Sequence, residues 1–308
     1  MSAPRPNLFL IGSMKSGTTY LSDLLGAHPA IFMSTPKEPC HFVDGRMLRR
    51  VWPYMWKRGY WRSTDRYLDL FAGAAAKPVV GEASTIYSYA PLISGVPQRI
   101  LAFNPQARFL YIMRDPVDRS ISHYWHRVRF WGERRPMLAA IRSDSQYTDV
   151  SHYARQLKEY LRHVERERIY VLTQEALLAD TVNQLSRVYT WLNVDPAFRP
   201  GLSVRTNSRP ELVYQVRGYG LLERLRRTSA YARLAPHLPR AARQLGYRLA
   251  LRGLRPDEAP LSEVQAYLRS VQTRQTEELS ALLNRSFPEW HTLQGEEHCT
   301  CWRVAQAR

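Results

Sequence analysis

The sequence predicts a three-layer α/β fold, in which helices flank a central parallel sheet and a helical region follows at the C-terminal end. Short apolar runs alternate with helical patterns over residues 7–195, which is typical of a parallel sheet. After Pro200 no strong strand pattern appears, and the chain becomes rich in arginine. We therefore expect a single domain over residues 1–308, with an α/β core at 7–195 and a mostly helical, Arg-rich extension at 196–308.

The strands expected in the first half are short and apolar, as buried parallel strands are. Asn7–Ile11 is the first, and Thr18–Leu25 follows as a helix because its leucines recur at helical spacing. His28 and Pro29 end that helix, since the residue before a proline avoids the helical conformation. Further elements are expected as strands at Ile31–Met33 and Val79–Gly81, a loop at Pro36–Gly45 and a short helix at Arg66–Phe71.

The clearest strand is Arg108–Met113, because it carries an unbroken apolar run. A helix should begin directly after it, with Asp115 as N-cap, Pro116 at the first helical position and Asp118 at the capping-box position. The later elements are expected as a strand at Ile169–Thr173 and as helices at Ser151–Glu165, Thr181–Leu192, Leu221–Arg255 and Leu261–Asn284.

The charge balance implies an anionic partner. The formal net charge is +17, and a nucleic acid, a membrane surface, an acidic glycan and a phosphorylated cofactor could each account for it. No recognised nucleic-acid motif appears, so we expect no specific nucleic-acid partner. The one-sided basic stretch Arg217–Arg255 leaves contact with an anionic acceptor or with membrane headgroups open, beside the plainer interpretation of a solvated basic face.

The cysteines and the apolar segments indicate a cytoplasmic protein. Cys40, Cys299 and Cys301 are too few for a disulfide framework, and His298 with the two late cysteines lacks a second pair to complete a zinc site. No apolar run reaches the roughly 20 residues that a membrane span needs, and no signal-peptide pattern opens the chain. We therefore expect free thiols, no metal site and a cytoplasmic location.

A candidate phosphate-binding loop joins the first strand to the first helix. Its glycine, Gly17, allows a tight turn that points backbone N–H groups at an anion, and the helix N-terminus adds its positive dipole end. Lys15 supplies a full charge, and Ser16, Thr18 and Thr19 supply hydroxyl donors. These features predict a P-loop-like fold with a phosphate at this edge of the sheet. The plainer interpretation is an ordinary glycine turn.

This loop differs from the nucleotide-binding loop of kinases and NTPases. That pattern places its lysine directly after the second glycine, whereas Lys15 precedes Gly17 by two residues. Such enzymes also need an acidic residue at a strand end to hold Mg²⁺, and the clearest strand here is followed by the cation Arg114. The sequence therefore predicts phosphate binding by protein charges without a metal, and a P-loop kinase or NTPase is the remote alternative.

A second candidate phosphate site follows the strand Arg108–Met113. Ligands of open parallel sheets sit at the carboxyl ends of the strands, and Arg114 lies at such an end. Ser122 comes eight residues later, about two helical turns along, and can face the same side. An arginine with a serine hydroxyl suits a terminal phosphate. The alternative is a capped helix start in which Arg114 simply pairs with Asp118.

Together these segments resemble the PAPS-dependent sulfotransferase family, above all its glycan-type, heparan-sulfate-sulfotransferase-like branch and the bacterial members. In that resemblance, residues 15–19 are similar to the 5′-phosphosulfate loop, and Arg114 and Ser122 are similar to the 3′-phosphate pair. Further matching segments are the K-E-P loop Pro36–Phe42, the G-E segment Gly81–Tyr87, and the helix–strand segment Tyr153–Tyr160 with Ile169–Leu177.

The resemblance implies transfer of a sulfuryl group from PAPS (3′-phosphoadenosine-5′-phosphosulfate) to an acceptor hydroxyl, with PAP as product and no metal. The reacting group passes in line between two oxygens, so the protein must position the reactants and stabilise charge. A sugar hydroxyl of a glycan or glycolipid is the leading acceptor. A hydroxyl of a secondary metabolite or lipid is the alternative.

The resemblance also implies catalytic roles. Glu38 matches the glutamate base of the glycan-type branch, and Lys15 can neutralise charge that grows on the leaving phosphate. Without the family, the favoured interpretation of Glu38 is an ordinary loop acid paired with Lys37 or Arg46.

Three histidines and an aromatic segment complete the candidates. His41, His123 and His126 are rival bases, because another branch of the family uses histidine, and His41 could instead orient Glu38. The aromatic stretch Trp52–Trp61 either lines the acceptor side or forms a satellite hydrophobic cluster.

Overall fold

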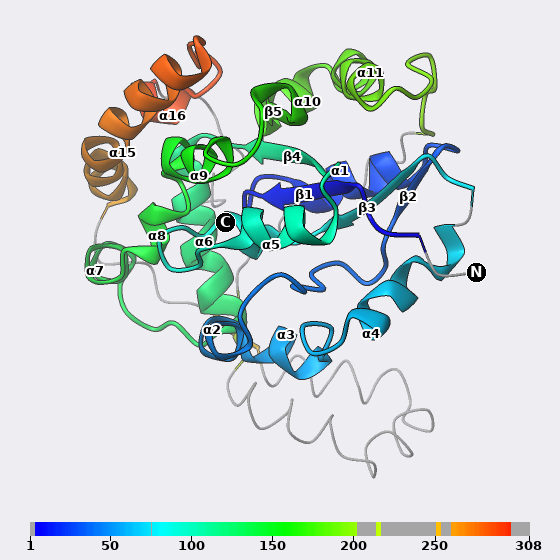
Figure 1. Ribbon diagram of the computed structural model, residues 1–308. Coiled ribbons are helices and arrows are strands. Elements are labelled where there is room, and N and C mark those ends of the chain that lie inside the picture. The colour runs from blue at the N-terminus through cyan, green and yellow to red at the C-terminus, as the bar shows by residue number, and fades with distance from the viewer. Residues whose placement is uncertain (1–3, 75, 202–213, 217–250, 254–259, 297–308) are drawn as a thin grey trace.

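The computed structural model describes residues 4–74, 76–201, 214–216, 251–253 and 260–296. Its centre is a five-stranded sheet in which every pairing is parallel (Figure 1). The expected fold class is therefore confirmed. The strands, in spatial order, are β2 (Ile31–Met33), β3 (Val79–Ala83), β1 (Leu8–Gly12), β4 (Arg108–Met113) and β5 (Ile169–Thr173).

Both faces of the sheet are covered, which is why the strands are apolar runs without alternation. Along β4, Phe109 and Tyr111 pack into one core cluster, whereas Leu110 and Ile112 pack into the cluster on the opposite face. The first face is covered by α5 (Val96–Phe103) and α9 (Tyr153–Leu161), and the second by α1 (Thr18–Gly26) and α11 (Thr181–Leu192). These layers account for the three-layer architecture.

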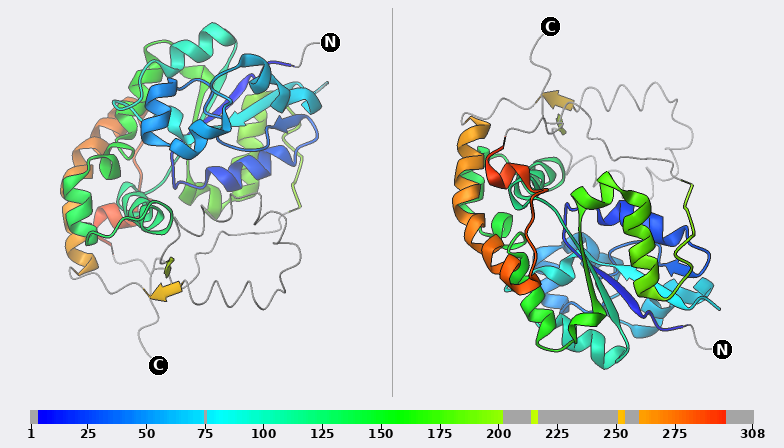
Figure 2. Two further views of the ribbon diagram at one scale, coloured as in Figure 1. Left: turned by 90° about the horizontal axis from the view of Figure 1, so that it is seen from below. Right: turned by 90° about the horizontal axis from the view of Figure 1, so that it is seen from above.

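A third cluster lies beside the sheet and includes α6 (Pro116–Phe130) and α15 (Leu261–Leu283). Figure 2 shows α15 along the outer edge of the molecule, away from α1 and α11. No described helix is both long and apolar enough to cross a membrane. The remaining helices are α2 (Gly45–Val51), α3 (Pro53–Arg58), α4 (Thr64–Leu68), α7 (Met137–Ser143), α8 (Gln146–Asp149), α10 (Gln174–Ala179) and α16 (His291–Gln294), with single 3₁₀ turns at Asp69–Ala74, Thr85–Ser88 and Arg166–Arg168.

Most expected elements occur within a few residues of their predicted bounds, but two helices differ. The segment expected as a helix from Ser151 to Glu165 is helical only over α9, and the Ser151 hydroxyl before it is bound to the buried Arg119 guanidinium and to the Pro116 carbonyl. The short helix expected at Arg66–Phe71 is split between α4 and a 3₁₀ turn.

The C-terminal extension contains a strand pair that the sequence did not predict. β6 (Tyr214–Val216) and β7 (Leu251–Gly253) pair antiparallel, and β7 lies within the segment Leu221–Arg255 that was expected as a helix, so that expectation is wrong at Leu251–Gly253. Three-residue strands carry too little pattern to be recognised locally, and their pairing spans a long stretch of chain. The rest of the helical prediction at Leu221–Arg255, together with Cys299 and Cys301, lies outside the described residues.

Candidate active site

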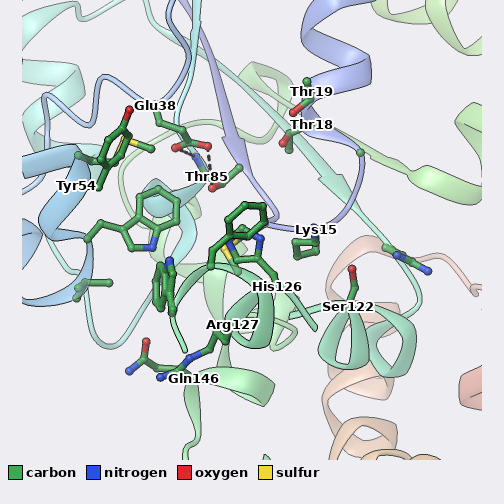
Figure 3. Close-up of a pocket in the computed structure, with 18 of the residues that line it drawn as sticks. Lys15, Thr18, Thr19, Glu38, Tyr54, Thr85, Ser122, His126, Arg127 and Gln146 are labelled. Carbon is green, nitrogen blue, oxygen red and sulfur yellow. Dashed lines mark hydrogen bonds between the residues drawn. The ribbon is translucent and has the colours of Figure 1, made fainter. Parts of the chain in front are cut away.

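A cavity of about 1150 Å³ opens at the carboxyl ends of the strands (Figure 3). Each of the five strands leads into a loop or helix that contributes to its lining, as expected for a ligand site of an open parallel sheet. In strand order these residues are Glu38 after β2, Thr85 after β3, Lys15 after β1, Arg114 after β4 and Gln174 after β5. Segments far apart in the chain thus meet at one place.

The loop between β1 and α1 has the shape that an anion site requires. Gly17 has φ +86° and stands at the N-cap of α1, where no side chain caps the helix. A Cβ at Gly17 would lie 3.1 Å from the Gln174 amide nitrogen, so a larger residue would crowd the loop. Lys15, Thr18 and Thr19 line the cavity beside Gly17.

Ser16 differs from its neighbours, because it is fully buried and does not line the cavity. Its hydroxyl has no hydrogen-bond partner among the described residues. The structure therefore brings together Lys15, Gly17, Thr18 and Thr19 at the cavity, and it places the Ser16 side chain behind them.

Lys37 is a cation at this loop that the sequence analysis did not assign to the phosphate site. Its ammonium group donates hydrogen bonds to the hydroxyls of Thr19, at 3.1 Å, and Thr18, at 3.4 Å. Burial lowers the pKa of Lys37, and the neighbouring Glu38 and Asp23 carboxylates oppose that shift. The K-E-P loop is therefore tied directly to the first turn of α1.

Glu38 reaches the cavity from a backbone in the left-handed region, with φ +57°. Its carboxylate accepts hydrogen bonds from Thr85, from the backbone N–H at 2.9 Å and from the side-chain hydroxyl at 3.0 Å (Figure 3). Burial raises the pKa of Glu38, whereas the charge of Lys37 and the Thr85 hydrogen bonds lower it. A half-buried carboxylate at the cavity wall is suited to accept a proton near neutral pH. Thr85 lies in the G-E segment Gly81–Tyr87 of the sequence analysis, but its contact with Glu38 was not predicted.

The second predicted pair, Arg114 and Ser122, also lines the cavity. The alternative ion pair is present too, since the Arg114 guanidinium lies 3.4 Å from the Asp118 carboxylate. The cavity position and the ion pair are therefore compatible.

The predicted cap of α6 is partly confirmed. The Asp115 carboxylate accepts from the backbone N–H groups of Val117 and Asp118, at 2.9 and 3.3 Å. The capping-box expectation for Asp118 is wrong, because the Asp115 N–H donates instead to Glu175, at 2.9 Å. Burial raises the pKa of Glu175 to about 7.

The three histidines occupy different surroundings. His41 does not orient Glu38: its Nδ1 lies 2.7 Å from the Tyr60 carbonyl, and its ring stacks on Tyr67. His123 is buried against Tyr147, and burial together with neighbouring cations holds its pKa well below the usual range. His126 does line the cavity, but burial and nearby cations lower its pKa to about 4.

The end of the cavity beside Glu38 is aromatic. Tyr54 at the start of α3 is 60% exposed, and Phe130 and Trp131 at the end of α6 are 45% and 42% exposed. Trp52 contacts Trp131 edge-on, with ring centroids 6.4 Å apart, so rings from α3 and α6 meet across this wall. Part of the predicted aromatic stretch thus lines the cavity, whereas Trp56 and Trp61 stack on each other, 5.9 Å apart.

The described lining is strongly cationic. It has one carboxylate, Glu38, against five lysine and arginine side chains, so an anionic ligand is favoured. The five cations are Lys15, Arg50, Lys57, Arg114 and Arg127.

Comparisons with known proteins agree with this geometry. A family model described as "Sulfotransferase family" matches residues 6–198. Human heparan sulfate glucosamine 3-O-sulfotransferase 5 is 24% identical over 204 residues, which cover 62% of this chain and 54% of that protein. Mouse heparan sulfate glucosamine 3-O-sulfotransferase 3B1 is 25% identical over 202 residues, 61% of this chain and 46% of that protein. The chain spans about half the length of these curated relatives.

A solved structure has the same fold. The sulfotransferase from Alicyclobacillus acidocaldarius superimposes with a TM-score of 0.66 at 24% identity, over 94% of this chain and 99% of that one.

Proposed function

The chain belongs to the sulfotransferase family, and from this premise we propose that it transfers a sulfuryl group from PAPS to an acceptor hydroxyl. One observation carries the proposal. The two predicted phosphate-binding segments, at Lys15–Thr19 and at Arg114 with Ser122, open into the same cavity as the half-buried carboxylate of Glu38. Anion-binding groups and a base thus stand where donor and acceptor must meet.

The residues of the cavity fit PAPS, which supplies the activated sulfuryl group when it is bound. The uncapped N-terminus of α1 and the ammonium group of Lys15 suit the 5′-phosphosulfate. Arg114 and Ser122 suit the 3′-phosphate, since a guanidinium and a hydroxyl both donate to phosphate oxygens. Lys37 holds the hydroxyls of Thr18 and Thr19 in place. These cations allow anion binding without a metal.

Glu38 and Lys15 carry the proposed chemistry of the protein. Glu38 accepts the proton of the acceptor hydroxyl, and Thr85 fixes the orientation of the carboxylate with two hydrogen bonds. Lys15 neutralises negative charge at the leaving phosphate oxygen.

We propose a sugar hydroxyl of a glycan or glycolipid as the acceptor. The relatives named above act on heparan sulfate glucosamine, according to their names. The exposed rings of Tyr54 and Trp131 can stack on the apolar face of a sugar, and Arg50 and Lys57 can attract an anionic substituent. The same wall suits the flat body of a secondary metabolite or a lipid, which remains the second acceptor class.

An acceptor screen tests the proposal. The protein is incubated with PAPS and, in separate reactions, with heparan oligosaccharides, glycolipids, aryl alcohols and long-chain alcohols. PAP release and mass spectrometry of each acceptor are measured. We expect the wild type to increase the mass of one acceptor class by 80 Da, and Glu38→Gln to leave that mass unchanged. No PAP release with any class, from a protein that binds PAP, would contradict sulfuryl transfer.

A further inference from the structure

Glu82 is a buried carboxyl that the proposed chemistry does not use. It lies on β3 opposite Phe9 of β1 and has no exposed surface. The hydroxyls of Tyr67, from α4, and of Tyr87 and Ser84, from the segment after β3, stand beside it, although neither Glu82 carboxyl oxygen makes a hydrogen bond of ordinary geometry with a described residue. An ionised carboxylate is costly in such a place, whereas a neutral carboxyl is tolerated when hydroxyl groups surround it.

The segment that carries Glu82 also holds the loop that carries Glu38. Three backbone N–H groups of the K-E-P loop donate hydrogen bonds to this segment, and Thr85 of the same segment donates two to the Glu38 carboxylate. The three links are Glu38 N–H to the Ala83 carbonyl at 2.9 Å, Cys40 N–H to the Ser84 hydroxyl at 3.2 Å and Phe42 N–H to the Tyr87 hydroxyl at 3.4 Å.

This support matters because the loop has an unfavourable backbone conformation. Glu38 and Cys40 have φ +57° and +55°, in the left-handed region that non-glycine residues rarely adopt. Such conformations persist only where surrounding contacts determine them. Two of the three links end on Ser84 and Tyr87, whose hydroxyls also stand beside Glu82.

We propose that Glu82 is a positioning residue for Glu38: as a neutral carboxyl among the hydroxyls of Tyr67, Tyr87 and Ser84, it keeps the K-E-P loop in the conformation that presents Glu38 to the cavity. The inference rests on the proposed role of Glu38. Ionised Glu82 would place a second negative charge near Glu38 in a poorly hydrated core. That charge would raise the pKa of Glu38 and disturb the hydroxyl groups that hold the loop.

The surrounding charges agree with a neutral Glu82. Burial raises the pKa of Glu82 to about 8, and the negative charge of Glu38 acts in the same direction. Burial also holds the pKa values of Tyr67, Tyr87 and the Cys40 thiol well above their usual range, so these neighbours keep their protons. Arg58, a cation that acts on the neighbouring Glu38 and Cys40, donates to the Lys37 and Glu38 carbonyls.

The pH profile of Glu82→Gln tests the proposal, because glutamine has the shape of the neutral carboxyl and cannot ionise. We expect the kcat of the wild type to fall above about pH 8 and that of Glu82→Gln to stay level, within about threefold of the wild-type value at pH 7. Glu82→Ala should lose about tenfold in kcat at pH 7 with an unchanged Kd for PAP. Glu165→Gln, on the exposed surface, is the control. An unchanged alkaline decline in Glu82→Gln would overturn the proposal.

A stability measurement decides the same point without an acceptor. Unfolded Glu82 loses its proton near its ordinary pKa, whereas folded Glu82 keeps it up to about pH 8. The raised pKa of Glu82 therefore contributes a fall in the free energy of unfolding of the wild type between about pH 4.5 and 8. This contribution is absent in Glu82→Gln. We expect the Tm advantage of Glu82→Gln over the wild type to grow from pH 5 to pH 8. A pH-independent difference would overturn the inference.

The two readouts also separate this inference from the proposed function. A wild type without sulfuryl transfer would contradict the proposed function, while the Tm difference would still report whether Glu82 is neutral. If Glu82→Gln does not fold, Tyr67→Phe removes a neighbouring hydroxyl and keeps the ring. It should lower kcat about three- to tenfold with an unchanged Kd for PAP, and an unchanged kcat would overturn the role of this cluster.

Discussion

At the scale of single residues, the site combines side chains that local sequence patterns reveal with others that only the fold brings in. Lys15 and Arg114 were predictable because each follows an apolar strand that ends at the sheet edge. Lys37 and Thr85 were not, because their roles depend on the register between neighbouring strands. His41 was assigned wrongly for the same reason: closeness in sequence to Glu38 did not bring the two side chains together.

The Thr85 hydroxyl should tune Glu38. Its hydrogen bond favours the ionised carboxylate, so Thr85→Ala should raise the pKa of Glu38. The acid side of the kcat profile should move to higher pH, and kcat below that limb should fall about 5- to 10-fold. Thr85→Ser keeps the hydroxyl and is the matched control. If the acid limb of kcat lies at the same pH in Thr85→Ala and in wild type, this hydrogen bond does not set the pKa of Glu38.

Lys37 should serve both the donor and the base. Lys37→Met keeps the length of the side chain and removes the charge that lowers the pKa of Glu38. We expect the acid limb of the kcat profile to move to higher pH. We also expect about 10-fold weaker PAP binding, because the hydroxyls of Thr18 and Thr19 lose their partner. Lys158→Met, on the surface beside Glu278, is the control. Wild-type affinity and pH profile in Lys37→Met would contradict this role.

At the scale of elements, short apolar runs predicted all five parallel strands, because a buried strand must be apolar on both faces. Element ends were less predictable where a side chain from elsewhere competes. Ser151, which was expected as the first residue of a helix, lies before α9, and its hydroxyl is bound to Arg119 and Pro116. The Asp115 N–H, which a capping box would pair with Asp118, donates to Glu175. Very short strands such as β6 carry no recognisable pattern.

The N-cap of α6 should matter for stability. Asp115 caps α6 and also accepts from the Leu293 N–H, at 2.9 Å, which ties α16 to the same point. Asp115→Ala should lower the free energy of unfolding by about 1–2 kcal/mol, measured by urea denaturation. Asp115→Asn retains an oxygen acceptor and should lose less. Equal stability of Asp115→Ala and wild type would show that the cap contributes nothing.

At the scale of the whole molecule, the sheet gathers five loops at one edge and concentrates positive charge there. The net charge of +17 predicted an anionic partner, but only the fold shows where five cations face a cavity with one acid. Charge alone could not distinguish a cofactor site from a surface that binds polyanions.

Salt should therefore weaken donor binding. Ions screen the attraction between the cavity and the phosphates of PAP, so Kd should rise several-fold between 50 and 500 mM NaCl. Calorimetry at the two salt concentrations measures the Kd for PAP. The rise of Kd with salt should be smaller in Arg114→Ala than in wild type. A salt-independent Kd would show that these charges do not hold the ligand.

The central claim is that one cavity holds a ligand with phosphates at Lys15 and Arg114, and calorimetric titration of PAP without magnesium tests it most directly. Wild type should bind tightly, Lys15→Ala and Arg114→Ala should each bind at least about 10-fold more weakly, and the exposed-surface control Arg162→Ala should match wild type. A folded wild type that binds no PAP, but binds ATP with magnesium, would contradict the account.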